Sequence, residues 1–275
     1  MGTIMFLMVT VLSFLNMLML VNAECDCGWK QGMRIVGGQE TGVNEYPFMS
    51  ALVDTELDTL YCGASIISER YALTAAHCVV HKKVENIVLL VGEHNVTTGA
   101  DTPYSKNYDL DKFIINPDWD AKKQKNDIAL LKTKLDIEFS VYVGPVCLPF
   151  KNSDNNFDYE LVTLLGWGLN STYGVKSDVL KETTVMILPN DYCYKFYQKL
   201  DTRQMCAYGD DTDSCNVDSG GPLIWWDNST RRLQVVGLIS AGRDCAGHMP
   251  SINVRVTSYL SWIVSSTPDV NYCKR

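Results

Sequence analysis

The chain has 275 residues, which is enough for one or two domains with sizeable hydrophobic cores. Its hydrophobic fraction of 46% and charged fraction of 20% are typical of a globular protein. The formal net charge of -8 argues against a nucleic-acid partner, because proteins that bind nucleic acid usually present a basic surface.

The first segment is an apolar run from Ile4 to Val21 that contains no charged residue and ends in Val21-Asn22-Ala23. This pattern is typical of a secretory signal peptide, and we expect residues 1–23 to be removed by cleavage after Ala23. The alternative is a membrane anchor, because about 18 apolar residues are marginally long enough to span a bilayer. We favour the signal peptide, since the downstream sequence has the features of a secreted protein.

Ten cysteines and three sequons support an extracellular location. An even number of cysteines in an exported chain indicates disulfide bonds, because cytosolic thiols stay reduced. The asparagines that begin the three sequons are Asn95, Asn170 and Asn228, and each is a candidate glycan acceptor. The sequence therefore predicts a secreted, disulfide-bonded glycoprotein.

Downstream of Cys27, short apolar stretches alternate with turn residues. The clearest stretches, rich in Val, Ile, Leu and aromatic residues, are 71–74, 87–91, 128–131, 161–165 and 233–239. Many short strands without alternating helices predict an antiparallel all-β sandwich or barrel. Only residues 256–265 show helical spacing of apolar residues, and no linker divides the chain after Arg34.

Three local motifs carry side chains that are suited to nucleophilic catalysis. In chain order they are Leu73-Thr-Ala-Ala-His77-Cys78, Asn126-Asp127-Ile-Ala-Leu-Leu131 and Asp218-Ser219-Gly-Gly-Pro222. Each motif alone has an ordinary explanation, as a buried histidine, a turn aspartate or a serine-glycine turn. Together, and in the order His, Asp, Ser, they resemble the trypsin-like serine protease family from about Cys27 to the C-terminus.

The resemblance implies a chymotrypsin-like fold, with two six-stranded antiparallel β-barrels and a C-terminal α-helix. It assigns residues 35–275 to one protease domain and implies no cofactor and no metal. The upstream segment Cys25-Asp-Cys-Gly-Trp-Lys30 looks most similar to serine proteases of hymenopteran venom.

The chemistry of the family explains why these three residue types are needed. A serine hydroxyl is a poor nucleophile at neutral pH and requires a positioned base. The resemblance implies that His77 takes the proton of Ser219 and later donates it to the leaving amine. Asp127 would fix the imidazole tautomer and stabilise the imidazolium ion.

The sequence Arg34-Ile35-Val36-Gly37-Gly38 resembles the family's activation site, which is cut after the basic residue. Residues 24–34 would then form an activation propeptide. The freed ammonium of Ile35 is expected to pair with Asp218 and to order the oxyanion loop beside Ser219. A buried ion pair stabilises weakly but makes an effective switch, because either charge left alone in the interior is costly.

The resemblance also proposes most of the disulfide bonds, namely Cys62–Cys78, Cys193–Cys206 and Cys215–Cys245. Cys147 is expected to hold the propeptide through Cys27 or Cys25. We expect the other member of that pair to bridge Cys273, and the partners of Cys25 and Cys27 remain exchangeable at this point.

Asp213 lies six residues before Ser219, where trypsin-like members place the carboxylate at the base of the primary pocket. A buried carboxylate there requires a cationic partner, which implies cleavage after Arg or Lys. The alternative is an exposed acid in the run 210–213. Ser240 and Gly242 match the segment that binds the substrate backbone in the family.

Several positions depart from the family pattern. Val217 replaces the glycine whose N–H is one oxyanion donor, the other being that of Ser219, and a β-branched residue resists unusual backbone angles. Loss of one donor costs about 2.7–4 kcal/mol in the transition state. Ala241 replaces a tryptophan, Asp244 stands at the pocket mouth, and Ser251 replaces a glycine that lines the pocket. We therefore expect a weakened preference for Arg and Lys, with Lys or a smaller residue as the alternative.

Gly92-Glu93-His94-Asn95 resembles the start of the family's calcium-binding loop, and Asp101 offers a further oxygen. Calcium takes roughly six to eight oxygen ligands, and no convincing closing glutamate follows Asp101. We favour an ordinary surface loop in which Asn95 is a candidate glycan acceptor.

Two functions fit the sequence. The first is a secreted, monomeric endopeptidase with protein or peptide substrates, an activating protease, serpin-type inhibitors and no membrane partner. The second is a catalytically weak or inactive homologue that acts as a binding protein, as suggested by the departures at Val217, Ala241, Asp244, Ser251 and Asn253. The complete His-Asp-Ser set favours the enzyme, because a pure binding protein has no physical need for all three groups.

Overall fold

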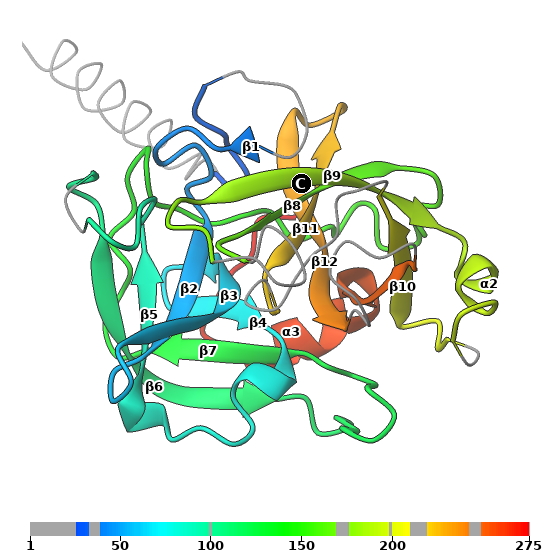
Figure 1. Ribbon diagram of the computed structural model, residues 1–275, viewed down its shortest axis with the longest axis horizontal. Helices are drawn as coiled ribbons and strands as arrows, with labels where there is room; N and C mark the ends of the chain where they lie inside the picture. The colour runs from blue at the N-terminus through cyan, green and yellow to red at the C-terminus, as the bar shows by residue number, and fades with distance from the viewer. Residues whose placement is uncertain are drawn as a thin grey trace, which may run out of the picture.

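The computed structural model describes residues 26–32, 39–98, 101–168, 176–197, 200–209, 219–241 and 249–274. These residues form two antiparallel β-barrels that lie side by side, with α3 close to the junction between them (Figure 1). The predicted all-β, double-barrel architecture is confirmed.

The first barrel closes in the order β2-β3-β4-β7-β6-β5. Its strands are β2 (Met49–Asp54), β3 (Thr59–Ser68), β4 (Tyr71–Thr74), β5 (Ile87–Val91), β6 (Lys106–Ile115) and β7 (Ala129–Thr133). The strands predicted at residues 71–74 and 87–91 coincide with β4 and β5. The strand predicted from residue 128 begins one residue later, because the N–H of Ile128 bonds to the carbonyl of Asn126 within a turn, at 2.9 Å.

The second barrel contains the strands β8 (Leu161–Gly166), β9 (Lys181–Leu188), β10 (Gln204–Tyr208), β11 (Pro222–Asp227), β12 (Arg232–Ala241) and β13 (Ser251–Arg255). It runs β9-β10-β13-β12-β11-β8 and closes because β8 also pairs with β9. The two-residue strand β1 (Gln39–Glu40) adds to the beginning of β9. Short helical turns are η1 (Ala76–Cys78), η2 (Val84–Asn86) and α2 (Asn190–Cys193).

One hydrophobic cluster runs from the first barrel across the interface into the second. It joins fully buried residues such as Leu52 and Leu89 to Trp167 and Val235 of the second barrel. Because close-packed interiors transmit small shifts and do not absorb them, this shared core gives the two barrels a defined relative position. Side chains that project into the interface from opposite barrels can therefore meet with fixed geometry.

The predicted C-terminal helix consists of the 3₁₀ turn η3 (Val256–Tyr259) followed by α3 (Leu260–Ser266). The chain then returns to the first barrel. The hydroxyl of Tyr71 donates to Asp269 Oδ1 at 2.7 Å, and Lys132 Nζ lies 2.8 Å from Asp269 Oδ2. The C-terminal segment therefore ties the end of the second barrel to β4 and β7 of the first.

Residues 26–32 dock against both barrels. Cys27 is disulfide-bonded to Cys147, and Gly28 donates to Pro145 O and accepts from the N–H of Leu233, both at 2.8 Å. The Trp29 indole covers Gly144 so closely that a Cβ there would collide with the ring. This segment is therefore held by covalent, hydrogen-bonded and packing contacts.

The expected signal peptide lies outside the described residues, as does the bond between Arg34 and Ile35. Within the described part of the chain, no helix combines the length and apolar character needed to cross a membrane.

We expect Asp269→Asn to lower the free energy of unfolding at neutral pH and to have little effect near pH 2. Hydrogen bonds from Lys132 and Tyr71 lower the pKa of Asp269 from 3.8 to about 2. The stabilising contribution is therefore complete above the unfolded-state value and disappears as the pH falls through about 2. Urea unfolding of both proteins between pH 7 and pH 2 measures this difference in the free energy of unfolding.

The matched control is Asp136→Asn. Asp136 pairs with Arg70 at 3.5 Å, but its side chain is 69% exposed, so the substitution is expected to have almost no effect. A destabilisation by Asp269→Asn that stays constant over the whole pH range would contradict the assignment.

Candidate active site

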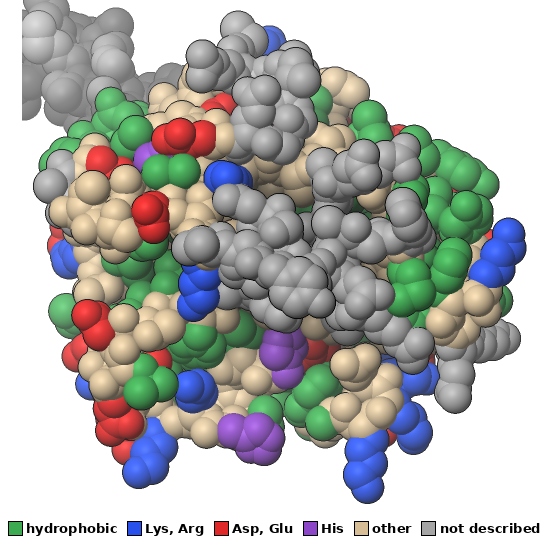
Figure 2. All heavy atoms as spheres, in the orientation of Figure 1, with side chains coloured by type: hydrophobic (Ala, Val, Ile, Leu, Met, Phe, Trp, Pro, Cys, Tyr) green, Lys and Arg blue, Asp and Glu red, His purple; other side chains and the backbone are tan. Residues whose placement is uncertain are grey.

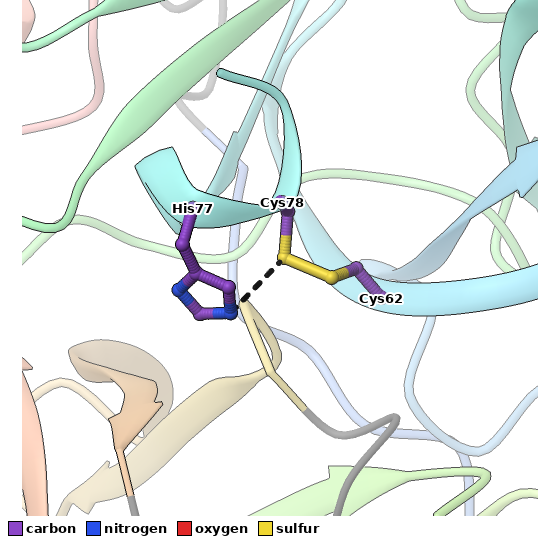
Figure 3. A group of neighbouring side chains, drawn as sticks. All are labelled: Cys62, His77 and Cys78. Atoms are coloured by element: carbon purple, nitrogen blue, oxygen red, sulfur yellow. Dashed lines mark hydrogen bonds between the residues drawn. A yellow bond between two sulfur atoms is a disulfide. The ribbon is translucent and has the colours of Figure 1, made fainter. Parts of the chain in front are cut away.

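His77 lies on the 3₁₀ turn η1, directly after β4. The preceding Ala75 and Ala76 are fully buried, and their small side chains let the chain turn against the core. The disulfide between Cys62 of β3 and Cys78 fastens this turn to the barrel wall. Figure 3 shows the consequence: Nε2 of His77 points toward the disulfide, 3.7 Å from Cys78 Sγ.

Asp127 lies just before β7 and is 2% exposed. Its Oδ1 accepts the backbone N–H of His77 at 2.9 Å, and its Oδ2 lies 2.7 Å from His77 Nδ1. The hydroxyl of Ser240, on β12 of the second barrel, donates to the same Oδ2 at 2.6 Å. Three donors from two barrels thus satisfy a buried carboxylate, which would otherwise be costly to bury.

The turn before Asp127 is formed by Asn126, which has a positive φ of 56°. Its side chain is tied on both sides: Nδ2 donates to Asp118 O at 2.7 Å, and Oδ1 accepts from the Tyr259 hydroxyl at 2.9 Å. Asparagine tolerates this left-handed conformation better than most residues. The turn therefore aims the Asp127 carboxylate at η1.

Ser219 approaches the same place from the second barrel. Its carbonyl accepts the N–H of Gly63 at 2.9 Å and lies 3.6 Å from Cys78 Sγ, the sulfur that also contacts His77 Nε2. Gly220 follows with φ of 80°, and a Cβ there would collide with Thr74 Oγ1 and lie 2.6 Å from Gly63 O. Only glycine allows the serine to be held this close to the first barrel.

The arrangement has the parts needed for acyl transfer. With Nδ1–H donated to a carboxylate, the lone pair on Nε2 of His77 is available to accept a proton. The His77 side chain is 34% exposed, so a substrate can reach it, whereas the side chain of Asp127 is 3% exposed. His77 is therefore a solvent-accessible base, and the buried carboxylate of Asp127 orients it.

Cys62, His77 and Cys78 lie close enough to suggest a metal site. The two sulfurs are joined in a disulfide and carry no thiolate, which is the form of cysteine that binds metals. In the loop that resembles a calcium site, Glu93 accepts from the His94 N–H and the Ser105 hydroxyl at 2.9 and 2.6 Å. Asp101 likewise accepts from the N–H of Asn95 at 2.9 Å. The carboxylates of Glu93 and Asp101 therefore accept hydrogen bonds from groups of the protein itself.

The described disulfides are Cys27–Cys147, Cys62–Cys78 and Cys193–Cys206. Cys147 thus pairs with Cys27, which decides between the two alternatives left by the sequence. Cys273 is also disulfide-bonded. The remaining cysteines, Cys25, Cys215 and Cys245, lie outside the described residues.

Of the other predicted site residues, some lie within the described part of the chain and some lie outside it. Ser251 is 4% exposed, and its hydroxyl bonds to Ala207 O at 3.3 Å and accepts from Asn253 Nδ2 at 3.0 Å. Outside the described residues lie Arg34, Ile35, Asn170, Asp213, Val217, Asp218, Gly242 and Asp244.

Two features of the site were not predicted. Ser240 was expected only to bind substrate backbone, yet its hydroxyl holds Asp127; a single serine at a strand end gives no signal of this. Gly63 supplies the N–H that holds the Ser219 carbonyl, and its own hypothetical Cβ would lie 2.8 Å from Gly221 Cα. The need for glycine at position 63 therefore follows from its close contact with the backbone of Ser219 and Gly221, which the sequence does not reveal.

Acidic and basic side chains are interspersed over the described part of the face in Figure 2. The net charge of -8 is therefore not gathered there into one patch that would steer a charged substrate.

Two β-barrels with a histidine–aspartate pair and a serine meeting between them define the chymotrypsin-like class of proteins. The family model described as Trypsin matches residues 35–263, and the chain belongs to this family. The predicted trypsin-like serine protease resemblance is thereby confirmed.

The chain is similar to several insect proteases. It is 44% identical over 256 residues to Venom serine protease 34 of Apis mellifera, covering 92% of this chain and 63% of that protein's length. It is 38% identical to a Venom serine protease of Polistes dominula, covering 91% of each chain. The CLIP domain-containing serine protease HP8 of Bombyx mori is 33% identical, over 88% of this chain and 72% of its own length. The predicted similarity to hymenopteran venom proteases is confirmed.

We expect Gly220→Ala to slow labelling of Ser219 by a fluorophosphonate probe by roughly a hundredfold, the cost of displacing a reacting group by about 1 Å. The new Cβ has no room between Thr74 and Gly63, so the serine must move. The labelling rate of the activated protein measures the effect.

Gly32→Ala is the matched control, because Gly32 has φ of 77° and no atom within 4 Å of its hypothetical Cβ. It carries the same backbone strain, about 1–2 kcal/mol, without a collision, and its labelling rate is expected to stay unchanged. A folded Gly220→Ala protein that labels at the normal rate would contradict this role.

Proposed function

We propose that the protein is a secreted serine endopeptidase that forms an acyl intermediate on Ser219. The observation that carries this proposal is the contact between His77 Nδ1 and Asp127 Oδ2 at 2.7 Å, with Ser219 held beside the same disulfide sulfur as His77 Nε2. Membership of the trypsin family supports the same reaction class. The proposed substrate is a protein or peptide.

In the proposed reaction, Ser219 Oγ attacks the carbonyl carbon of the scissile peptide bond while its proton passes to His77 Nε2. Asp127 stabilises the imidazolium ion that forms. His77 then donates the proton to the leaving amine as the carbon–nitrogen bond breaks, and water hydrolyses the ester by the same steps. The N–H groups of Ser219 and Val217 are proposed as donors to the oxyanion.

We further propose that residues 1–23 are a signal peptide and that the secreted chain is a zymogen activated by cleavage between Arg34 and Ile35. The family match begins at Ile35, which supports the start of the mature domain there. The new ammonium group would pair with Asp218. The disulfide Cys27–Cys147 would keep residues before the cleavage point attached after activation. An upstream protease and serpin-type inhibitors are the proposed partners.

For substrate preference, we propose cleavage after Arg or Lys through Asp213, weakened by changes around the pocket. Ser251 stands where the family has a glycine, and its hydroxyl group would shorten the space for a long cationic side chain. Ala241 and Asp244 alter the substrate-facing segment further. The preference is therefore expected to shift toward Lys or a smaller residue.

The second candidate function is a secreted binding protein with little or no catalytic activity. Among the departures from the family pattern, the valine at position 217 favours it most directly, because a β-branched residue resists the backbone angles that aim an oxyanion donor. The retained His77, Asp127 and Ser219 favour the enzyme.

We expect covalent fluorophosphonate labelling of the purified chain only after it has been cut between Arg34 and Ile35. The probe reacts with a serine made nucleophilic by its base, so labelling should disappear in Ser219→Ala and in His77→Ala. N-terminal sequencing confirms the cut, and labelling is read by mass spectrometry. Absence of labelling on a chain that begins at Ile35 would support the binding protein instead.

We expect Ser251→Gly to increase kcat/KM for peptides with Arg before the scissile bond more than for peptides with Ala there. Removing the side chain enlarges the proposed pocket while Asp213 keeps its charge. A set of peptides that differ only at this residue measures the ratio. Equal or better cleavage after apolar residues by the unmodified enzyme would refute the role of Asp213.

A further inference from the structure

The hairpin that joins β11 to β12 is a tightly fixed turn at the end of the second barrel that points away from Ser219. Arg231 adopts a positive φ of 54°, and its N–H bonds to Asp227 O at 2.7 Å. The Asp227 side chain accepts from the N–H and hydroxyl of Ser229, at 2.8 and 2.7 Å, and from the Thr230 hydroxyl at 2.8 Å. The conformation of residues 227–231 is therefore well defined.

Asp227 is turned inward, where it is 3% exposed and also accepts from Gln234 Nε2 at 3.1 Å. Because successive side chains of a strand point to opposite faces, the preceding Trp226 points outward. Trp226 is 42% exposed, and Asn228 is exposed as well. An exposed indole and an exposed asparagine amide therefore stand two residues apart, on a turn whose conformation is fixed.

Trp226 belongs to an exposed apolar row on the outside of the second barrel. Leu161 of β8 is 59% exposed and is the cross-strand partner of Met186 of β9, which is 37% exposed. The β11–β8 ladder pairs Ile224 with Thr163, so Trp226 and Leu161 each lie two residues further on, on the same edge of the barrel. Exposed apolar side chains that gather at one edge of a barrel often have something to cover them.

We propose that Asn228 carries an N-linked glycan whose first N-acetylglucosamine packs on the face of the Trp226 indole. The inference requires passage through the secretory pathway, as in the proposed function, but no catalytic activity. The co-reactant is a lipid-linked oligosaccharide pyrophosphate. The Asn228 amide nitrogen forms a bond to the anomeric carbon and loses a proton, and the sugar–phosphate bond breaks to release the lipid pyrophosphate.

The chemistry of the two surfaces matches. One face of a pyranose ring presents C–H groups, and the face of an aromatic ring carries partial negative charge. A rigid turn lowers the entropic cost of bringing them together, because the glycan is already tethered two residues from the indole. The covered indole would then no longer be an exposed hydrophobic group.

The sequon at Asn95 lacks these features. Its amide oxygen accepts from the N–H and hydroxyl of Thr97 at 3.0 and 2.8 Å, and Asn95 is only partly exposed. The residue two positions earlier is Glu93, which is 7% exposed. A glycan there has no neighbouring aromatic face two residues before it. The third sequon asparagine, Asn170, lies outside the described residues.

A glycan on this hairpin would affect the stability of the two strands that the hairpin joins. Its other end leads into the candidate active site, because β11 begins three residues after Ser219 and β12 contains Ser240. Stabilising the turn therefore stabilises the pair of strands that carries both residues. We expect an effect on the unfolding equilibrium, with no contact between the sugar and the reacting groups.

The test uses the full chain carrying Ser219→Ala, secreted from insect cells with a heterologous leader. This background makes the result independent of protease activity and of the native signal peptide. Four proteins are compared: this parent, Trp226→Ala, Asn228→Gln and the double variant. Peptide mass spectrometry determines occupancy at each sequon, and urea unfolding gives the equilibrium constants. Asn228→Gln leaves the hydroxyls of Ser229 and Thr230 in place on Asp227.

We expect a glycan on Asn228 and an effect of Trp226→Ala that is roughly two- to tenfold larger in the unfolding constant when the glycan is present, the size of a good aromatic contact. The N-acetyl protons of the first sugar should shift upfield in the NMR spectrum and return in Trp226→Ala. Tyr192→Ala is the matched control, since Tyr192 is 47% exposed on α2 and should show no dependence on the glycan.

Two results would overturn the proposal. One is an Asn228 peptide that carries no glycan in the secreted protein. The other is an occupied Asn228 with the same Trp226→Ala effect in the presence and absence of the glycan, which would leave the sugar without a contact on the indole.

Discussion

The buried carboxylate of Asp127 is the interaction on which the candidate site depends. A carboxylate with 2% exposure is costly unless donors satisfy its oxygens, and here the donors come from both barrels. His77 supplies its backbone N–H and Nδ1 from the first barrel, and Ser240 supplies its hydroxyl from the second. The set of hydrogen bonds to Asp127, which orients the His77 imidazole, is therefore complete only when the two barrels are correctly docked. A shift of either barrel would leave a buried charge without a partner.

The nucleophile side of the site is set by steric exclusion. Gly220 and Gly63 let the backbone around Ser219 lie against the first barrel at distances that no Cβ allows. The disulfide Cys62–Cys78 occupies the remaining space and contacts both His77 Nε2 and the Ser219 carbonyl. Hydrogen bonds thus orient the base, whereas close packing positions the serine. The continuous hydrophobic cluster between the barrels keeps both arrangements in register.

The sequence predicted the features that local pattern determines. Short apolar runs located β4 and β5 within their observed bounds, and helical spacing located η3 and α3. The motifs around His77, Asp127 and Ser219 identified the residues that the fold brings together. The sequence did not predict the Ser240 hydroxyl on Asp127 or the packing of Trp29 on Gly144, because both join residues more than 110 positions apart. Contacts of this kind follow from barrel docking and leave no periodic signal along the chain.

The two sides of the proposed activation bond are anchored at one place on the second barrel. Before it, Lys30 pairs with Glu45 at 2.8 Å and lies 3.7 Å from Glu182. After it, β1 pairs with β9 so that Gln39 lies opposite Glu182. Glu182 also accepts the hydroxyl of Tyr46, and burial together with this contact raises the pKa of that phenol, so it stays protonated as a donor. Cleavage between Arg34 and Ile35 would therefore leave both flanking anchors in place. The proposed cleavage would thus act on a segment held at Lys30 on one side and at Gln39 on the other.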